Sequence, residues 1–328
     1  MLGSTDQALV AVYLIGVAAL GLFVRSPASS TEYIFASRRL TLPAFVMTLV
    51  STWYGGILEI GRFSYINGAS TILVFGLFYY IAAVFYAYIV VPRVAEGDFK
   101  TIPEAIESRF GWRAALVSAV VILFVASPAP YIKILSTIFG FLYGIDMLHG
   151  VILCTGFSVI YTIRGGFSSV IRTDALQFAL MYSGFLGTLI FLYTRHGGYE
   201  FLSSSLPSAM LSFPGSMDWS YIIVWGFIAL VTFIDPNFYQ RAFAGQSVKT
   251  VRRGILLSVS LWFVFDLVSI SVGLYAAALI PEVTHSPYLD LVSISLPPVA
   301  QGIFVISLLS VVMSTIDSFI LISGFTIG

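Results

Sequence analysis

The sequence has few charged residues and a single cysteine. Only 10% of its 328 residues are charged, against roughly a quarter in an ordinary soluble domain. Cys154 stands alone, which excludes an intrachain disulfide framework or a cluster of thiolate metal ligands. The formal net charge is zero, so no basic surface for nucleic acid is expected. The residues also show no paired nucleophile and base and no phosphate-binding loop, so we do not expect an enzyme.

Long hydrophobic runs dominate the sequence instead. Hydrophobic residues make up 58% of the chain, and a membrane-spanning helix needs about 20 mostly apolar residues. On that criterion the sequence predicts an all-α polytopic membrane protein of about nine transmembrane helices, with the lipid bilayer as its main partner. The predicted spans are Gln7–Val24, Leu42–Ile66, Thr71–Val91, Ala115–Leu135, Met147–Ile163, Asp174–Tyr193, Trp219–Ile234, Gly254–Ile280 and Pro298–Phe325.

Lysine and arginine are distributed unevenly between the predicted connections. Thirteen of the sixteen lie in the odd-numbered connections, whereas the opposite loops hold Arg195 alone. By the positive-inside rule, the N-terminus is external and the C-terminus cytoplasmic. We therefore expect a multi-pass protein of the plasma membrane, or of the inner membrane in a bacterium. Residues 1–328 are expected to form a single transmembrane domain, and the sequence does not indicate an oligomeric state.

Carboxylates inside the predicted spans are candidate functional residues, because a charge in hydrocarbon costs several kcal/mol. They are Glu59, Asp174, Asp235, Asp266 and Asp317. Glu59 and Arg62 lie three residues apart, so a structural ion pair is as good an interpretation as a functional one. Asp174 directly follows Thr173 at the start of a span, where it either caps the helix or binds a cation. Asp235 precedes a proline near a span end, which favours a structural role.

Two spans combine polar groups with signs of local weakness. The second contains Gly55 and Gly56, and each glycine weakens a helix by about 1 kcal/mol relative to alanine. A break there would release backbone carbonyls toward a cavity. The ninth contains three hydroxyl residues beside Asp317. Such hydroxyls usually bond to carbonyls one turn earlier, but oxygen atoms on two facing helices also suit a hard monovalent cation.

Three segments of the chain resemble the sodium:solute symporter family, which includes proline, pantothenate, iodide and sodium-glucose transporters. They are Tyr33 to Leu40, then Tyr161 to Phe167 with Thr173 to Gln177, and finally Pro236 to Arg241. The resemblance implies the inverted-repeat leucine-transporter architecture. One extra helix would occupy residues 7–24, the first five-helix repeat 42–193 and a partial second repeat 219–325. Because family members normally continue further, the resemblance implies a C-terminally truncated member.

The resemblance also implies a function. The protein would be a sodium-coupled secondary symporter that carries a small organic solute, such as an amino acid, a carboxylate or a vitamin, into the cell by alternating access. Sodium would be the coupling ion. Two alternatives stay open: a membrane sensor that serves as the input module of a signalling protein, and a fragment that does not transport.

Site residues follow from the resemblance, position by position. The sodium ligands would be the carbonyls of Ser51, Tyr54 and Val311 with the hydroxyls of Ser314 and Thr315, although a shift of two would favour Trp53 and Gly56 in the broken helix. A second cation site would use Asp174 and Asp317, where a carboxylate in place of the family's hydroxyl leaves proton coupling open.

Candidate solute-binding residues lie on the predicted broken helix. They are Trp53, Glu59, Arg62 and Phe63. Arg62 would suit a carboxylate unless Glu59 pairs with it. Ile228, Val231 and Thr232 stand where the sugar-transporting branch has an asparagine and two aromatic residues, which disfavours a sugar.

Overall fold

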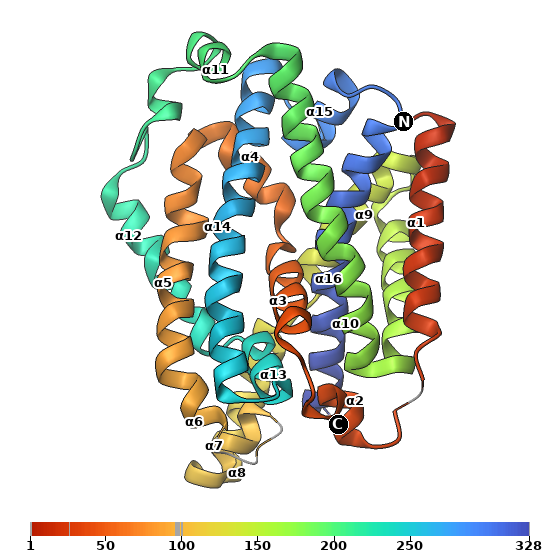
Figure 1. Ribbon diagram of the computed structural model, residues 1–328, viewed down its shortest axis with the longest axis vertical. Helices are drawn as coiled ribbons and strands as arrows, with labels where there is room; N and C mark the ends of the chain where they lie inside the picture. The colour runs from red at the N-terminus through yellow and green to blue at the C-terminus, as the bar shows by residue number, and fades with distance from the viewer. Residues whose placement is uncertain (1, 26, 96–98, 100, 328) are drawn as a thin grey trace.

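A computed structural model describes residues 2–25, 27–95, 99 and 101–327. These residues form helices and no strand; their single β-bridge joins Leu40 to Gly245. Seven continuous helical segments are long and apolar enough to cross a membrane, and a bent pair of helices adds an eighth. The long helices run side by side along one axis, with the two termini near opposite ends (Figure 1). The predicted all-α membrane architecture is confirmed.

The helices follow the predicted spans in order. They are α1 (Ser4–Leu22), α3 with α4 (Leu42–Ser51, Ile57–Asn67), a segment Leu73–Val94 that includes α5 (Phe78–Phe85) and most of α6 (Val91–Ala95), α8 with α9 (Trp112–Val125, Ala129–Tyr143), α10 (Met147–His196), α12 with α13 (Trp219–Ile228, Pro236–Ala244), α14 (Val248–Leu279) and α16 (Ala300–Ile327).

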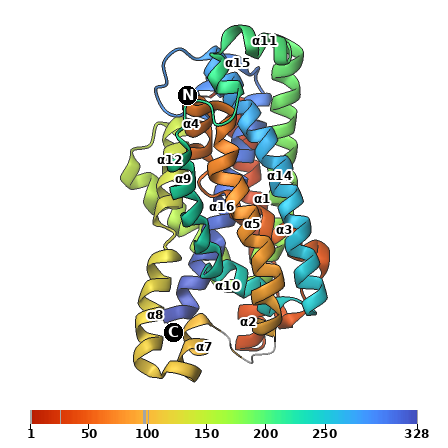
Figure 2. The same ribbon diagram turned by 90° about the vertical axis from the view of Figure 1, so that its left-hand side faces the viewer.

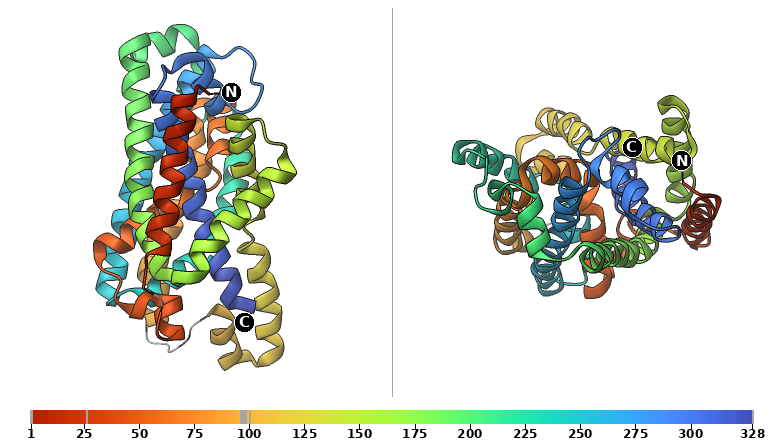
Figure 3. Two further views of the ribbon diagram at one scale, coloured as in Figure 1. Left: turned by 90° about the vertical axis from the view of Figure 1, so that its right-hand side faces the viewer. Right: turned by 90° about the horizontal axis from the view of Figure 1, so that it is seen from above.

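The helix α10 contains two of the predicted spans. It covers 50 residues, but Gly166 interrupts it with φ 57° and ψ −147°. A Cβ atom at this glycine would lie 2.5 Å from the carbonyl oxygen of Tyr33, so both the backbone angles and the space favour glycine. The chain turns back here, and the second half rises to the opposite end (Figure 3). With α10 counted as two spans, the described residues contain the nine that the sequence predicts.

Two spans differ in their boundaries from the prediction. The fourth is interrupted between α8 and α9, where Pro128 cannot donate a backbone hydrogen bond. The seventh passes beyond its predicted end at Ile234 into α13. Asp235 caps α13, because its side chain accepts a hydrogen bond of 2.8 Å from the backbone N–H of Asn237. This cap agrees with the structural interpretation of Asp235.

Figure 2 shows α12 descending beside α5 toward the end that holds the C-terminus.

Short helices cover the two ends of the bundle. α2 (Ser30–Phe35) and α7 (Ile102–Phe110) lie at the end that holds the C-terminus, while α11 (Tyr199–Ser205) and α15 (Pro287–Ser295) lie at the other (Figure 1). Thr101 begins α7 by accepting a hydrogen bond of 3.2 Å from the backbone N–H of Glu104. Arg38, which follows α2, and Arg109, in α7, therefore lie toward the end that holds the C-terminus.

The helix α16 forms the centre of the bundle. In its apolar 18-residue stretch, 94% of the residues are buried. The helix packs against α1, α9 and α10. Asp6 on α1 fixes the start of α16, because its Oδ1 accepts hydrogen bonds of 2.8 Å from the backbone N–H groups of Val299 and Gly302. The helix α16 thereby faces the junction of α3 and α4, which positions the candidate site.

Candidate functional site

The second span is broken between α3 and α4. Residues Thr52–Tyr54 form a turn of 3₁₀-helix, and the chain bends by 60° between Leu42–Tyr54 and Ile57–Ser70, at the two glycines. Gly55 allows the close approach of two neighbouring helices, since a Cβ atom there would lie 2.6 Å from Cγ2 of Thr315 and 2.6 Å from Cδ1 of Tyr131. The break that the two glycines predict is present, and it lies directly against α16.

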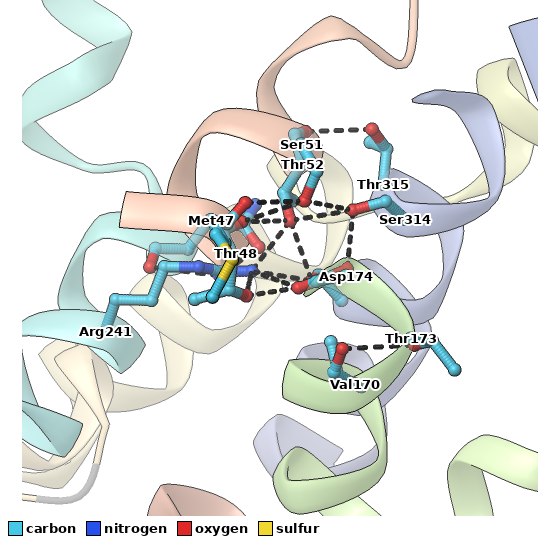
Figure 4. Close-up of polar contacts among 12 residues, drawn as sticks. Met47, Thr48, Ser51, Thr52, Val170, Thr173, Asp174, Arg241, Ser314 and Thr315 are labelled. Carbon is cyan, nitrogen blue, oxygen red and sulfur yellow. Dashed lines mark hydrogen bonds and ion pairs between the residues drawn. The ribbon is translucent and has the colours of Figure 1, made fainter. Parts of the chain in front are cut away.

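Hydroxyl groups of α16 meet this break. Thr315 Oγ1 donates to the carbonyl oxygen of Thr52 at 2.8 Å and lies 3.1 Å from the carbonyl oxygen of Val311. Ser314 Oγ lies 2.8 Å from Ser51 Oγ (Figure 4). Four of the five predicted sodium-binding residues therefore come together, and Thr315 contacts two carbonyl oxygens, that of Val311 and that of Thr52 in the broken helix.

Tyr54, the fifth predicted residue, directs its side chain elsewhere. Its hydroxyl donates a hydrogen bond of 2.9 Å to the carbonyl oxygen of Trp262 on α14. Only its backbone carbonyl could serve an ion, as the prediction requires. Tyr54 thus stays a predicted ligand, while its ring anchors the break against α14.

Asp174 joins the same cluster from α10. It is fully buried and lies eight residues beyond Gly166, well inside the second half of the helix. The capping interpretation is therefore wrong, since the helix already begins near Gly166. Ser314 Oγ donates to Asp174 Oδ1 at 2.6 Å, and the hydroxyl of Thr48 donates to Oδ2. The carboxylate thus connects α10 to both halves of the proposed ion site.

Arg241 completes the cluster with a buried positive charge. Its Nη2 atom lies 3.6 Å from Asp174 Oδ2, and both side chains have zero exposure. The same nitrogen donates hydrogen bonds of 2.7–2.9 Å to the hydroxyls of Thr48, Thr52 and Ser318. The sequence placed Arg241 in a cytoplasmic connection, and that assignment is wrong because α13 carries it into the core.

The donor set of the cluster suits a hard monovalent cation. Hydroxyl, carbonyl and carboxylate oxygens can replace a water shell, and they come from α3, the 3₁₀ turn, α10 and α16 (Figure 4). The guanidinium of Arg241 on α13 already donates to three of the hydroxyls, so an ion would share them with it. A divalent or transition-metal centre would use several carboxylate, imidazole or thiolate ligands. Within the described residues, no group of three or more such side chains could hold a metal ion. The residues present fit sodium better than those metals.

Asp317 faces a different neighbour from Asp174. The hydroxyl of Tyr161, on the first half of α10, lies 2.7 Å and 2.6 Å from its two carboxylate oxygens. In the part of the chain that the structure describes, no hydrogen bond or ion pair joins Asp317 to Asp174. A second cation site that uses both carboxylates stays a prediction.

A cavity of about 360 Å³ also borders the break. Its lining residues are Leu49, Thr52, Trp53, Tyr54, Gly56, Glu59, Ile60, Phe75, Tyr79, Tyr131, Val231, Asp235, Asn237, Phe238 and Phe319. The predicted pocket residues Trp53 and Glu59 are among them, whereas Arg62 and Phe63 are not. Arg62 Nε instead lies 2.8 Å from Glu59 Oε2, as its structural interpretation expected, and Phe63 packs against Phe75 and Trp225.

Comparison with known proteins identifies the family. Residues 33–327 match the model of the sodium:solute symporter family. The chain belongs to this family. It is 30% identical to the Sodium/pantothenate symporter of Haemophilus influenzae over 48% of this chain and 35% of that protein. It is 27% identical to the High-affinity proline transporter PutP of Bacillus subtilis over 70% of this chain and 51% of that protein.

The fold is shared with a protein of known structure. A structure described as the substrate-bound outward-open state of a Na+-coupled sialic acid symporter superposes with a TM-score of 0.83 at 17% identity. The similarity covers 97% of this chain and 71% of the other. The chain spans about half or less of the curated relatives named above. The shared architecture supports the leucine-transporter-like helix order that the sequence predicted.

From the sequence of this symporter-family chain, four members of the cluster receive no site role, although one of them is among the three hydroxyl residues beside Asp317. They are Thr48, Thr52, Arg241 and Ser318. Thr48 precedes Ser51 and Thr52 by three and four residues, a spacing that places all three on one helical face. That spacing could have identified both threonines. Arg241 ends one of the family-like segments, but that motif does not reveal its pairing, because the partner Asp174 lies on another helix.

Proposed function

We propose that the full protein is a sodium-coupled symporter that carries a small organic solute across the membrane by alternating access. One observation carries the proposal: Ser314 and Thr315 meet the broken helix at Ser51 and Thr52, with Asp174 beside them. Membership of the symporter family supports the choice of sodium as the coupling ion. Sodium would bind to the hydroxyls of Ser314 and Thr315, to carbonyls at Ser51, Tyr54 and Val311, and near Asp174.

The geometry suggests how ion and solute binding are coupled. Thr52 contributes its carbonyl oxygen to the cluster and also lines the cavity. The 3₁₀ turn therefore takes part in both sites. An ion that bridges the 3₁₀ turn and α16 favours conformations in which the turn and the helix are close together. A solute that binds to the same conformations then binds more tightly when the ion is present. The effect is reciprocal, as symport requires.

The orientation in the membrane belongs to the same proposal. The helices α2 and α7 and the start of α14 lie at the end that holds the C-terminus (Figure 1), and Arg38, Arg109 and Arg252 lie in or next to them. The positive-inside rule places that end in the cytoplasm and the N-terminus outside. Burial of Arg241 removes one cation from this surface but leaves α2, α7 and the start of α14 on it. The plasma membrane, or the inner membrane of a bacterium, is the expected location.

The test replaces the two hydroxyls. In the full protein reconstituted into vesicles, the double substitution Ser314→Ala and Thr315→Ala should raise the sodium concentration for half-maximal uptake at least tenfold. Ser307→Ala is the matched control, because Ser307 is also buried on α16 but only donates to the carbonyl of Phe304 at 2.6 Å. Equal sodium dependence in the double variant and the control would contradict the proposed site.

A further inference from the structure

The walls of the cavity combine aromatic rings with negative charge. Seven of its fifteen lining residues are aromatic and two are carboxylates, Glu59 and Asp235, whereas none of the described lining residues is lysine, arginine or histidine. A volume of about 360 Å³ is within the range of small-molecule sites. The composition is unusual for a pocket that would take an anion.

The charges around the cavity leave one described carboxylate, Asp235, without a direct ion pair, although Arg241 lies near enough to interact with it electrostatically. Glu59 is paired with Arg62 at 2.8 Å, and Arg241, on the same helix as the cap residue Asp235, is paired with Asp174. Asp235 Oδ1 accepts hydrogen bonds from the backbone and side-chain N–H groups of Asn237 at 2.8 Å and 3.1 Å. Among the described residues no cationic side chain lies within 4.0 Å of Asp235. The cavity therefore has a net negative charge.

The aromatic walls are held in place by mutual packing. Trp53 makes edge contacts with Tyr79 and Phe238 at centroid distances of 5.3 Å and 5.7 Å. On the opposite side Tyr131 stacks on Phe319 at 5.3 Å. Rings fixed in this way present π-electron surfaces, which attract a cation most strongly when water is excluded.

We propose that this cavity binds a monovalent organic cation, a small ammonium compound with an apolar body. Asp235 neutralises the charge, and the rings of Trp53, Tyr131 and their neighbours surround the body. The inference rests on the proposed symport function and names its substrate class. A solute carboxylate would instead face Asp235 in a site without a basic lining residue. The sequence offered Arg62 as a possible ligand for a solute carboxylate, but Arg62 is already paired with Glu59.

The test compares three probes of nearly equal shape. Benzylammonium, benzyl alcohol and benzoate differ mainly in charge, and their binding to the purified full protein can be measured by calorimetry in saturating sodium. Wild-type protein should bind benzylammonium at least tenfold more tightly than benzyl alcohol, a difference of about 1.4 kcal/mol, and benzoate most weakly. This comparison needs no variant, so it does not depend on the folding of a mutant.

A matched pair of variants assigns the preference to Asp235. Asp235→Asn retains a side chain that caps helices about as well but removes the charge, and it should reduce the preference for benzylammonium over benzyl alcohol to less than threefold. Asp218→Asn is the control, because Asp218 caps α12 by accepting a hydrogen bond of 2.7 Å from the backbone N–H of Ser220 and does not line the cavity. Its preference should equal that of wild type.

The outcomes separate the two proposals. Equal or tighter binding of benzyl alcohol or benzoate to wild type would overturn the cation inference, as would an unchanged preference in Asp235→Asn. Sodium-driven uptake of a neutral or anionic solute alone would retain symport and reject the substrate class. Selective binding of benzylammonium that is unaffected by sodium would retain the cation site and reject sodium coupling.

Discussion

The buried pair of Asp174 and Arg241 yields a quantitative prediction. At the observed 3.6 Å, the attraction is about 4.6 kcal/mol for an effective dielectric constant of about 20. Asp174→Asn leaves the buried guanidinium without its counter-charge, and breaking such a pair costs about 3–5 kcal/mol. Arg241→Gln should be costly for the same reason. The double variant removes both charges and should lose much less stability than the sum of the two.

A double-mutant cycle on the melting temperature in detergent measures this coupling. Each single variant should lower the midpoint by roughly 5–10 °C, and the interaction energy should be about 2–3 kcal/mol, at the upper end for contacting residues. Asp218→Asn, which changes a capping aspartate at the end of another helix, should shift the midpoint by less than about 2 °C. Additive losses in the double variant would refute the reasoning and show that the two charges do not stabilise each other in the fold.

Three further predictions test other parts of the account. Gly55→Ala should raise the sodium concentration for half-maximal uptake severalfold, because the added Cβ atom would lie 2.6 Å from Cγ2 of Thr315. Gly56→Ala should not raise it, because no atom lies within 4 Å of the added Cβ. Equal effects of the two substitutions would contradict the close approach at Gly55. Glu59→Gln should change the unfolding free energy by at most about 1 kcal/mol, because more than half of the surface of both the Glu59 and the Arg62 side chains is exposed. A larger loss of stability, measured by thermal melting, would contradict the assignment of this ion pair to the exposed surface. Alkaline phosphatase fused after Gly245 should be inactive and after Gly197 active; the reverse pattern would overturn the orientation.

Much of the fold could be predicted because hydrophobic length is a local property of the sequence. Each apolar run of about 20 residues became a helix or a broken helix in the expected order. The break at Gly55 was predictable for a similar reason, since helix propensity is also local. Boundaries were less certain, as the continuation of α12 into α13 shows. There Asp235 and Pro236 resemble a helix end but begin a new helix instead.

The site was only partly predictable because its contacts join distant segments. Ser314 and Thr315 were identified from their own motif, and the structure places them against Ser51 and Thr52. The pairing of Arg241 with Asp174 joins residues from different helices, and no single segment reveals it. Asp174 shows the same limit: its neighbour Thr173 suggested a helix start, but the helix begins at a glycine that the local pattern did not single out as its boundary.

Direct binding of radioactive sodium to the purified full protein tests the central claim most directly. Wild type and the control Ser307→Ala should bind sodium saturably with the same affinity. The double substitution Ser314→Ala and Thr315→Ala should weaken that binding at least tenfold, about 1.4 kcal/mol or more, in protein that still shows a cooperative melting transition without sodium. Unchanged sodium affinity in the folded double variant would contradict the account, because the ion would then bind away from the junction of α16 with the broken helix.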